Sequence, residues 1–170
     1  MEFKELAAKR YSCRKFSDRK VDRSLMMQII ETANRAPTAV NKQPFRIFWM
    51  ESDAAKEALH KVTNYTFGAD NFLVLGCKND LGWVRPYDQR PFADVDGSIV
   101  ATHMMLQIED LGLSTTWVGY FDAPLLKQLC PAMADYDLIA VFPIGYAAED
   151  AAPSHRHPER KPLEEILTTL

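Results

Sequence analysis

The sequence predicts an α+β fold, and three observations carry that prediction. Apolar residues recur at helical spacing in several segments, most clearly over residues 22–35. Residues 72–77, FLVLGC, form a continuous apolar run of the kind that fills a buried strand. No internal repeat or low-complexity tract occurs before residue 147, so we expect one domain over residues 1–170 with a C-terminal arm at about 147–170.

The N-terminal elements follow from apolar spacing and from residues that begin or end helices. Residues 2–9 place apolar side chains at i, i+3 and i+4, which predicts a short amphipathic helix. A longer helix is expected over residues 22–35, with Asp22 or Ser24 as its N-cap. It must end before Pro37, because proline disfavours helical geometry in the residue that precedes it.

The middle of the chain combines two strands with a helix and then becomes irregular. Residues 45–50 and 72–77 predict strands, and residues 54–62 between them predict a helix. Residues 82–91 hold two aromatic residues and two prolines, which predicts irregular structure there.

Residues 92–111 form the longest expected helix, and its middle is apolar on most faces. Gly112 is well placed to end this helix in a left-handed cap. Beyond it we expect a strand at 115–118, a helix at 124–129 and a strand at 138–144. A chain of this length has few other helices that could surround the helix at residues 92–111. We therefore expect a second copy of the chain to cover this helix in an obligate homodimer.

The composition excludes several classes of protein. The chain is 47% hydrophobic and 25% charged, which excludes a disordered or collagen-like chain. A net charge of −3 argues against a general nucleic-acid binder. Three distant cysteines form no CxxC pair, so neither a disulfide framework nor a zinc site is indicated. The amino terminus lacks the apolar core of a secretory signal and no uncharged run could span a membrane, so we expect a cytoplasmic protein without a membrane partner.

Arg10, Ser12 and Arg14 form the first cluster that could bind a ligand. In an extended segment, positions i, i+2 and i+4 point to one side, so two guanidiniums and a hydroxyl would converge on an anion such as a phosphate. The alternative is a solvated basic stretch after a helix, where cations are favoured. The spacing leaves both interpretations open.

Two further segments carry groups suited to a ligand. Prolines stiffen residues 37–44, where Asn41 and Gln43 offer amides that both donate and accept, as the edge of a planar heterocycle requires. The alternative is a connection whose amides satisfy their own backbone. Within residues 111–122, Gly119 allows the backbone to approach a ligand closely, unless this segment is ordinary core.

The remaining candidates give no catalytic residue set. Residues 154–161 form a basic arm in which His155 and His157 resemble a metal pair only weakly, so we expect no metal. Asp94 and Asp96 flank a helix start, where acids complement the dipole, and we do not interpret them as a catalytic pair. Dinucleotide, phosphate-loop and nucleophile-elbow motifs are not found. We therefore expect a cofactor to carry the chemistry.

Five segments occur in order along nearly the whole chain. They are RYSCRKF at residues 10–16, APTAVNKQPF at 36–45, LGLSTTWVG at 111–119, FPIGY at 142–146 and RKPLEEI at 160–166. Together they resemble the signatures of the FMN-dependent nitroreductase family. The resemblance implies a homodimer with a central, mostly antiparallel sheet flanked by helices. It also implies a long buried helix and two FMN sites at the interface, each built from both subunits.

The resemblance assigns residues to the FMN site by position. Arg10 and Ser12 resemble the phosphate and ribityl contacts. Arg14 resembles the cation at the pyrimidine end of the flavin, where it would tune the reduction potential, and no catalytic residue is assigned. The implied cofactor-binding residues are Arg10, Ser12, Arg14, Pro37, Thr38, Asn41, Gln43, Val118, Gly119, Arg160 and Lys161.

The other implied positions come from three parts of the chain. Residues 37–43 match a segment that reaches FMN, commonly from the other subunit. Val118 and Gly119 match the backbone near flavin N5. Arg160 matches a C-terminal phosphate cation, with Lys161 or Arg156 as a helper. The aromatic residues Phe67, Trp83 and Tyr87 lie where no motif is found, and they are pocket candidates.

The implied function is that of an NAD(P)H-dependent FMN oxidoreductase. Hydride would pass from NADH or NADPH through flavin N5, by a ping-pong scheme, to nitroaromatic, quinone or similar small electron-poor acceptors. One alternative is a flavin-binding or flavin-processing protein without NAD(P)H turnover. Another is a dimeric interaction module that is not an enzyme.

Overall fold

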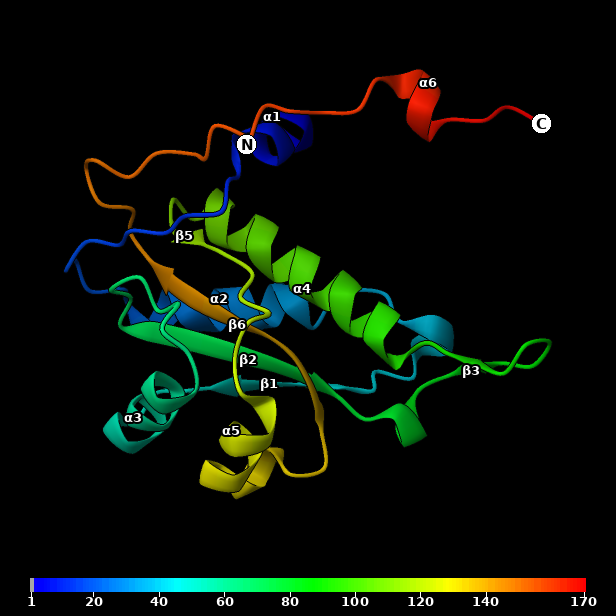
Figure 1. The fold of residues 1–170 in the computed structure, drawn as a ribbon, viewed down its shortest axis with the longest axis horizontal. Helices are drawn as coiled ribbons and strands as arrows, with labels where there is room; N and C mark the ends of the chain where they lie inside the picture. The colour runs from blue at the N-terminus through cyan, green and yellow to red at the C-terminus, as the bar shows by residue number, and fades with distance from the viewer. Residues whose placement is uncertain (1) are drawn as a thin grey trace.

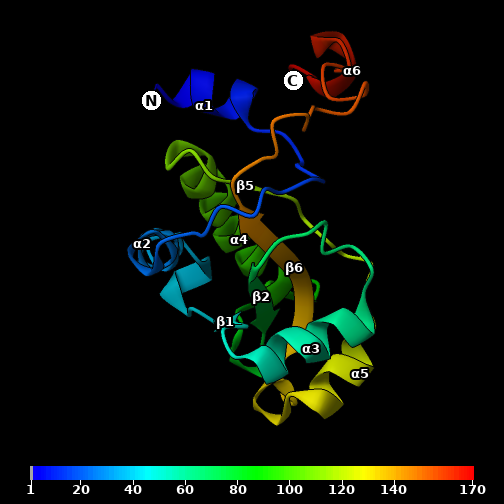
Figure 2. The ribbon, with the colours of Figure 1, turned by 90° about the vertical axis from the view of Figure 1, so that its left-hand side faces the viewer.

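The computed structural model describes residues 2–170, and its core is a four-stranded sheet between two layers of helices (Figure 1 and Figure 2). The strands lie in the order β1 (Phe45–Trp49), β2 (Asn71–Cys77), β6 (Asp137–Gly145) and β5 (Ser114–Thr115). Neighbouring strands all pair antiparallel, so the expected α+β fold with a mostly antiparallel sheet is confirmed.

Helices cover both faces of this sheet. α2 (Arg23–Ala33) and α4 (Ala93–Asp110) pack on one face, and α3 (Asp53–Val62) and α5 (Ala123–Leu129) pack on the other (Figure 2). α1 (Phe3–Lys9) lies against the C-terminal half of α4. These five helices begin and end within one or two residues of the bounds that spacing predicts.

The apolar run in β2 supplies both sides of the core. Because alternate side chains of a strand point to opposite faces, Leu73 and Leu75 face α2 and α4 while Phe72 and Val74 face α3 and α5. All four side chains are fully buried. The prediction of a strand buried on both faces is therefore confirmed.

Polar residues and glycine define the helix ends. Asp22 accepts a hydrogen bond from the Ser24 N–H at 2.9 Å, so Asp22 is the N-cap of α2. Asp122 caps α5 by accepting from the Leu125 N–H at 2.9 Å. Gly112 follows α4 with a φ of +72°, the left-handed geometry that a glycine adopts without a Cβ penalty.

Residues 82–91, expected to be irregular, contain a short hairpin instead. β3 (Val84–Arg85) pairs antiparallel with β4 (Arg90–Pro91). Strands of two residues are too short to leave a periodic pattern in the sequence. The remaining short elements are η1 (Ala39–Asn41), η2 (Asn79–Leu81), η3 (Pro131–Met133) and α6 (Leu163–Ile166).

The strand expected at residues 115–118 is shorter than predicted. The ladder between β5 and β6 stops where Pro143 would be the next partner. Proline has no N–H to donate, and the Pro143 carbonyl instead accepts from the Thr115 hydroxyl at 2.7 Å. Val118 continues only as an isolated bridge to Val141.

α4 is buried on one face within a single chain. Gly97 lets this face lie close to the sheet, since a Cβ there would be 2.3 Å from Ile139 Cδ1. On the other side Ser98 and Thr102 are exposed. The expected burial on nearly all sides is therefore not reached within residues 2–170 of one chain, because α1 packs against the C-terminal half of α4 and leaves Ser98 and Thr102 exposed.

The C-terminal residues leave the body as an extended arm (Figure 1). An ion pair between Lys15 and Asp150 holds the start of the arm. Farther along, the arm is exposed, and so are the apolar side chains of Leu163 and Ile166 in α6. None of the helices within residues 2–170 is long and apolar enough to cross a membrane.

Candidate functional site

The segment of residues 10–16 runs beside β5 and is held there by its backbone. Ser12 pairs with Thr115 in a parallel bridge, and the Cys13 N–H donates to the Thr115 carbonyl at 3.0 Å. The Cys13 side chain is fully buried while Arg14 is exposed, as the alternation of an extended chain requires. Ser12 and Arg14 therefore line the same cavity.

Arg14 lies on the wall of two neighbouring cavities. The first, which we call the polar cradle, has a volume of about 240 Å³ and is lined by Ser12, Ser154, Arg156 and His157 as well as Arg14. The second, which we call the aromatic slot, has a volume of about 150 Å³. Besides Arg14, the aromatic slot is lined mainly by Tyr65, Phe67, Trp117, Val118, Gly119 and Tyr120.

The charges of the polar cradle are suited to an anion. Lys15 is neutralised by its ion pair with Asp150. Within residues 2–170, Arg14 and Arg156 form no ion pair with a carboxylate, and Arg14 Nη1 donates to the Ser12 carbonyl at 3.2 Å. Two guanidiniums beside serine hydroxyls match the geometry and charge of a phosphate group.

Tyr11 packs beside the polar cradle without adding charge. Its ring contacts His157 edge to face, with ring centroids 6.4 Å apart. Burial, with contributions from Cys13 and Glu109, raises the pKa of Tyr11 to about 12. The phenol therefore stays protonated at physiological pH, and the cradle keeps the positive charge of its arginines.

The aromatic slot presents ring faces and an open backbone. Within residues 2–170, a Cβ at Gly119 would meet only Trp117 Nε1, at an ordinary distance of 3.9 Å, so no steric contact there requires glycine. Val118 is fixed beside it by two backbone hydrogen bonds to Val141, of 2.9 and 3.0 Å. The exposed ring of Tyr120 and the half-open ring of Trp117 are suited to a flat ligand.

Apart from the loop of residues 37–44, three residues that the resemblance assigns to the site lie outside both cavities. Arg10 follows the last turn of α1 and is half-buried. Arg160 donates to backbone carbonyls of the arm itself, and Lys161 forms an ion pair with Glu165 at 3.7 Å. Of the cations near the end of the chain, Arg156 is the one that lines the polar cradle.

The loop of residues 37–44 lies beside the start of α4. The Ala39 N–H donates to Asp96 Oδ1 at 2.8 Å, and Asp96 belongs to the first turns of α4. Within the loop, Gln43 Nε2 donates to the Asn41 carbonyl at 3.2 Å. The Gln43 amide thus bonds the backbone of its own loop, as the alternative interpretation of the sequence expects.

This loop also holds a strained backbone. Val40, Asn41 and Gln43 have φ angles of +46°, +56° and +50°, a region that branched side chains rarely adopt. Val40 is exposed, so its packing does not compensate for the strain. Strain of this kind persists where surrounding contacts fix it, and it is frequent at ligand sites.

The two parts of the predicted site are far apart in one chain. The loop attaches to α4 at Asp96, whereas Lys9, just before the Arg10 segment, pairs with Glu109 at 3.4 Å. These two positions on α4 are separated by about 20 Å, given a rise of 1.5 Å per residue. Figure 1 shows the loop and the N-terminal segment at opposite ends of this helix. The chain alone does not bring Arg14 together with the loop.

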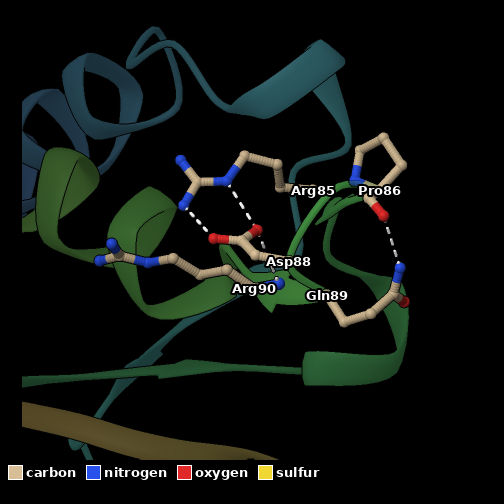
Figure 3. A network of polar contacts seen from close by, with 5 residues as sticks. All are labelled: Arg85, Pro86, Asp88, Gln89 and Arg90. Atoms are coloured by element: carbon tan, nitrogen blue, oxygen red, sulfur yellow. Dashed lines mark hydrogen bonds and ion pairs between the residues drawn. The ribbon is translucent and has the colours of Figure 1, made fainter.

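The β3–β4 hairpin projects from the body beside the start of α4 (Figure 1). Figure 3 shows how its contacts stiffen it: Arg85 Nε and Nη2 both donate to the Asp88 carboxylate, and Gln89 Nε2 donates to the Pro86 carbonyl at 2.8 Å. Tyr87 at the tip is 95% exposed. Of the three aromatic pocket candidates, therefore, Tyr87 points away from the body.

The other two aromatic candidates have separate roles. Phe67 lines the aromatic slot. Trp83 packs edge to face on Phe92, with ring centroids 5.1 Å apart, and anchors the base of the hairpin.

Cys77 lies at the end of β2 and lines neither of the two cavities. Burial, followed by the charges of Asp94 and Asp96, raises the pKa of the Cys77 thiol to about 12 and keeps it protonated. Within the described residues, no group of three or more His, Cys, Asp or Glu side chains is placed to hold a metal ion.

Sequence reasoning missed Ser154, Tyr65 and the burial of Asp96. A signal for Ser154 exists, because Ser-x-Arg occurs at Ser12 and again at Ser154, and both pairs line the polar cradle. No sequence pattern singles out Tyr65 or Asp96. A tyrosine outside any motif and an acid near the start of a helix are both common in sequences without a functional role.

The fold and the arrangement of these segments are those of a known family. A family model described as "Nitroreductase family" matches residues 7–69 and 65–146. The chain therefore belongs to the nitroreductase family. A solved nitroreductase family protein from Clostridium difficile 630 is 35% identical, with a TM-score of 0.90 and complete coverage of both chains.

More distant relatives carry several names. A protein named NADH dehydrogenase from Thermus thermophilus is 28% identical and covers 98% of this chain and 95% of its own. An iodotyrosine dehalogenase 1 homolog from Caenorhabditis elegans is 26% identical over 96% of this chain, which spans 60% of that relative's length. A protein from Exiguobacterium sibiricum, solved in complex with FMN, is 20% identical over 100% of this chain and 98% of its own, with a TM-score of 0.83.

Proposed function

We propose that the protein is an FMN-dependent oxidoreductase that uses NADH or NADPH to reduce small electron-poor acceptors such as nitroaromatic compounds and quinones. The observation that carries the proposal is the position of Arg14 between the aromatic slot and the polar cradle. A ligand that joins a flat ring system to a phosphate needs these two sites side by side. Membership of the nitroreductase family and the FMN complex of the Exiguobacterium protein support this assignment.

The donor set of the polar cradle fits the phosphate end of FMN. The hydroxyls of Ser12 and Ser154 and the guanidinium of Arg156 would bind phosphate oxygens. The family resemblance also assigns three further cations to the phosphate end, namely Arg10, Arg160 and Lys161.

The aromatic slot fits the ring end. Trp117 and Tyr120 would lie against the flat ring system, and the backbone of Val118 and Gly119 would face its centre. Arg14, at the junction, would meet the pyrimidine end, where the reduced ring carries its negative charge. A guanidinium there stabilises the reduced form and so raises the reduction potential.

We also propose that a second copy of the chain completes each site. The loop that carries Pro37, Thr38, Asn41 and Gln43 lies about 20 Å along α4 from the end where Arg14 lies, so it would serve the site of the other copy. A two-fold dimer that covers the open face of α4 would bring each loop to the other chain's Arg14. The exposed polar side chains of the loop support this arrangement.

FMN bound in this site would supply hydride transfer through its N5 atom. The chain's own residues would bind the phosphate, orient the ring and hold a compensating positive charge at Arg14. Because the cofactor would supply the hydride chemistry, the protein itself would need no catalytic acid or base.

Anaerobic reduction of the purified protein tests the proposal. The protein is expected to be yellow or to become so with added FMN, to lose its flavin absorbance on addition of NADH or NADPH, and to regain it with a quinone or nitroaromatic compound. A colourless protein that cannot be reconstituted overturns the proposal. A yellow protein that neither nicotinamide bleaches would instead identify a flavin-binding or flavin-processing protein.

A further inference from the structure

Asp96 is a buried acid whose carboxylate is only half used. Asp96 is 1% exposed, and its Oδ1 accepts a hydrogen bond from the Ala39 N–H at 2.8 Å. Its Oδ2 is also buried and has no hydrogen-bond partner within residues 2–170. A buried carboxylate oxygen without a partner opposes folding, because water no longer solvates its charge.

Fold stability alone does not account for a carboxylate at this position. An asparagine could offer the same acceptor to Ala39 without burying a charge. Asp94, also in the first turns of α4, is exposed and could complement the helix dipole on its own. Unlike Asp94, Asp96 offers an acceptor that reaches the Ala39 N–H of the loop.

The loop needs an attachment because its backbone is strained. Val40, Asn41 and Gln43 all have positive φ angles, and an unattached loop would relax toward more common geometry. Contacts within the loop include the Gln43 N–H donating to Thr38 Oγ1 at 3.1 Å. The bond from Ala39 to Asp96 is the contact that ties this turn to the rigid helix.

We infer that Asp96 is a positioning residue that holds this loop ready to contact the flavin. The inference rests on the proposed function, in which Thr38, Asn41 and Gln43 reach the flavin of the other copy. By fixing Ala39, Asp96 keeps the loop in its strained form before the ligand arrives, so that binding does not have to order it. The protein thus trades some folding stability for a prepared site.

Two substitutions and one control test this inference. Asp96→Ala removes the acceptor, Asp96→Asn keeps it without the charge, and Asp94→Ala removes an exposed acid in the same helix turns. Three quantities are measured for each: amide hydrogen exchange of Ala39 in flavin-free protein, melting temperature of flavin-free protein, and the Kd for FMN.

Asp96→Ala is expected to speed the exchange of the Ala39 amide and to weaken FMN binding, each by about tenfold, the equivalent of one hydrogen bond. Its melting temperature should be equal to or above that of the wild type, because the unpaired buried oxygen is gone. Asp96→Asn should restore most of the FMN affinity and the slow exchange. Asp94→Ala should leave exchange and FMN affinity unchanged.

The outcomes separate this inference from the proposed function. If the wild type binds FMN and Asp96→Ala binds it equally well, the inference alone is overturned. It is also overturned if Asp96→Ala lowers the melting temperature or fails to fold, since Asp96 would then be an ordinary core residue. A wild type that binds no FMN overturns the proposed function and this inference together.

Discussion

Ser12 lies beside Thr115 in a parallel bridge, and this one pairing decides where Arg14 goes. The bridge aligns the N-terminal segment with β5, buries Cys13 and turns Arg14 outward to the wall shared by both cavities. A basic segment that could have been solvated surface is thereby fixed against the sheet.

Replacing Arg14 should change both the affinity and the potential of the flavin. Arg14→Ala is expected to weaken FMN binding by about tenfold or more and to lower the reduction potential, because a charge-assisted hydrogen bond to the reduced ring is lost. Titration with FMN and anaerobic redox titration measure the two effects. Lys61→Ala is the control, since Lys61 is an exposed cation of α3 that lines neither cavity. An Arg14→Ala protein with an unchanged flavin potential would remove the assigned role.

Two glycines should respond in opposite ways to an added methyl group. Gly97→Ala is expected to destabilise the fold by about 1–3 kcal/mol or more, because its Cβ would overlap Ile139 Cδ1 at 2.3 Å. Gly119→Ala should leave stability nearly unchanged, since its Cβ would meet only Trp117 Nε1 at 3.9 Å. It should instead weaken FMN binding or block access to the flavin. Thermal melts with and without FMN check both, and normal flavin binding and turnover in Gly119→Ala would contradict the placement of this residue.

Within the C-terminal arm, Arg156 should contribute more to FMN affinity than Arg160. Arg156 lines the polar cradle, whereas Arg160 is bonded to backbone carbonyls of the arm. Arg156→Ala is therefore expected to weaken FMN by about tenfold and Arg160→Ala by less. If the effects are reversed in binding titrations, Arg160 rather than Arg156 contacts the phosphate and this placement of the arm is wrong.

The Asp70 carboxylate gives a prediction about pH. Hydrogen bonds from Lys20 and Lys56, both 2.8 Å long, hold the pKa of Asp70 below its usual 3.8. The ionised form is thus favoured in the native state, so its stabilising effect is present above about pH 4 and is lost as the pH falls through the lowered pKa. Asp70→Asn should destabilise the protein at pH 7 by less than about 1 kcal/mol, because the group is half exposed.

Urea unfolding at pH 7 and pH 3 measures this difference, which should shrink at the lower pH. Asp18→Asn is a suitable control, since Asp18 is an exposed acid in the same segment as Lys20. A difference between Asp70→Asn and wild type that grows on acidification would show that the ion pairs are not its cause.

Spacing predicted the helices well because their apolar faces meet the sheet. α2 illustrates this: Met26, Ile29 and Ala33 recur at helical intervals and are all fully buried. The β3–β4 hairpin left no comparable pattern. It is held by the Arg85–Asp88 pair and by the packing of Trp83 on Phe92, contacts that depend on folded geometry rather than on periodicity.

The candidate site was predictable in part for the same reason. Ser12 and Arg14 follow from the alternation of an extended chain, which is a local property. Asp96 could not be recognised, because an acid in a first helical turn is ordinary until the loop folds over it and buries it. The polar cradle is lined by Arg156 rather than Arg160 because of how the arm lies against the segment of residues 10–16. This contact joins the two ends of the chain, so the spacing of residues within either segment does not predict it.

The length of α4 has a genetic consequence if each site draws on both chains. A chain with Arg14→Ala and a chain with Asn41→Ala would each form dimers in which both sites are impaired. Co-expressed, they would form mixed dimers in which one site combines both defects while the other combines an intact Arg14 with an intact loop. The two impaired alleles would therefore complement each other, and a tagged mixed dimer purified from such cells should recover full flavin affinity at that one site.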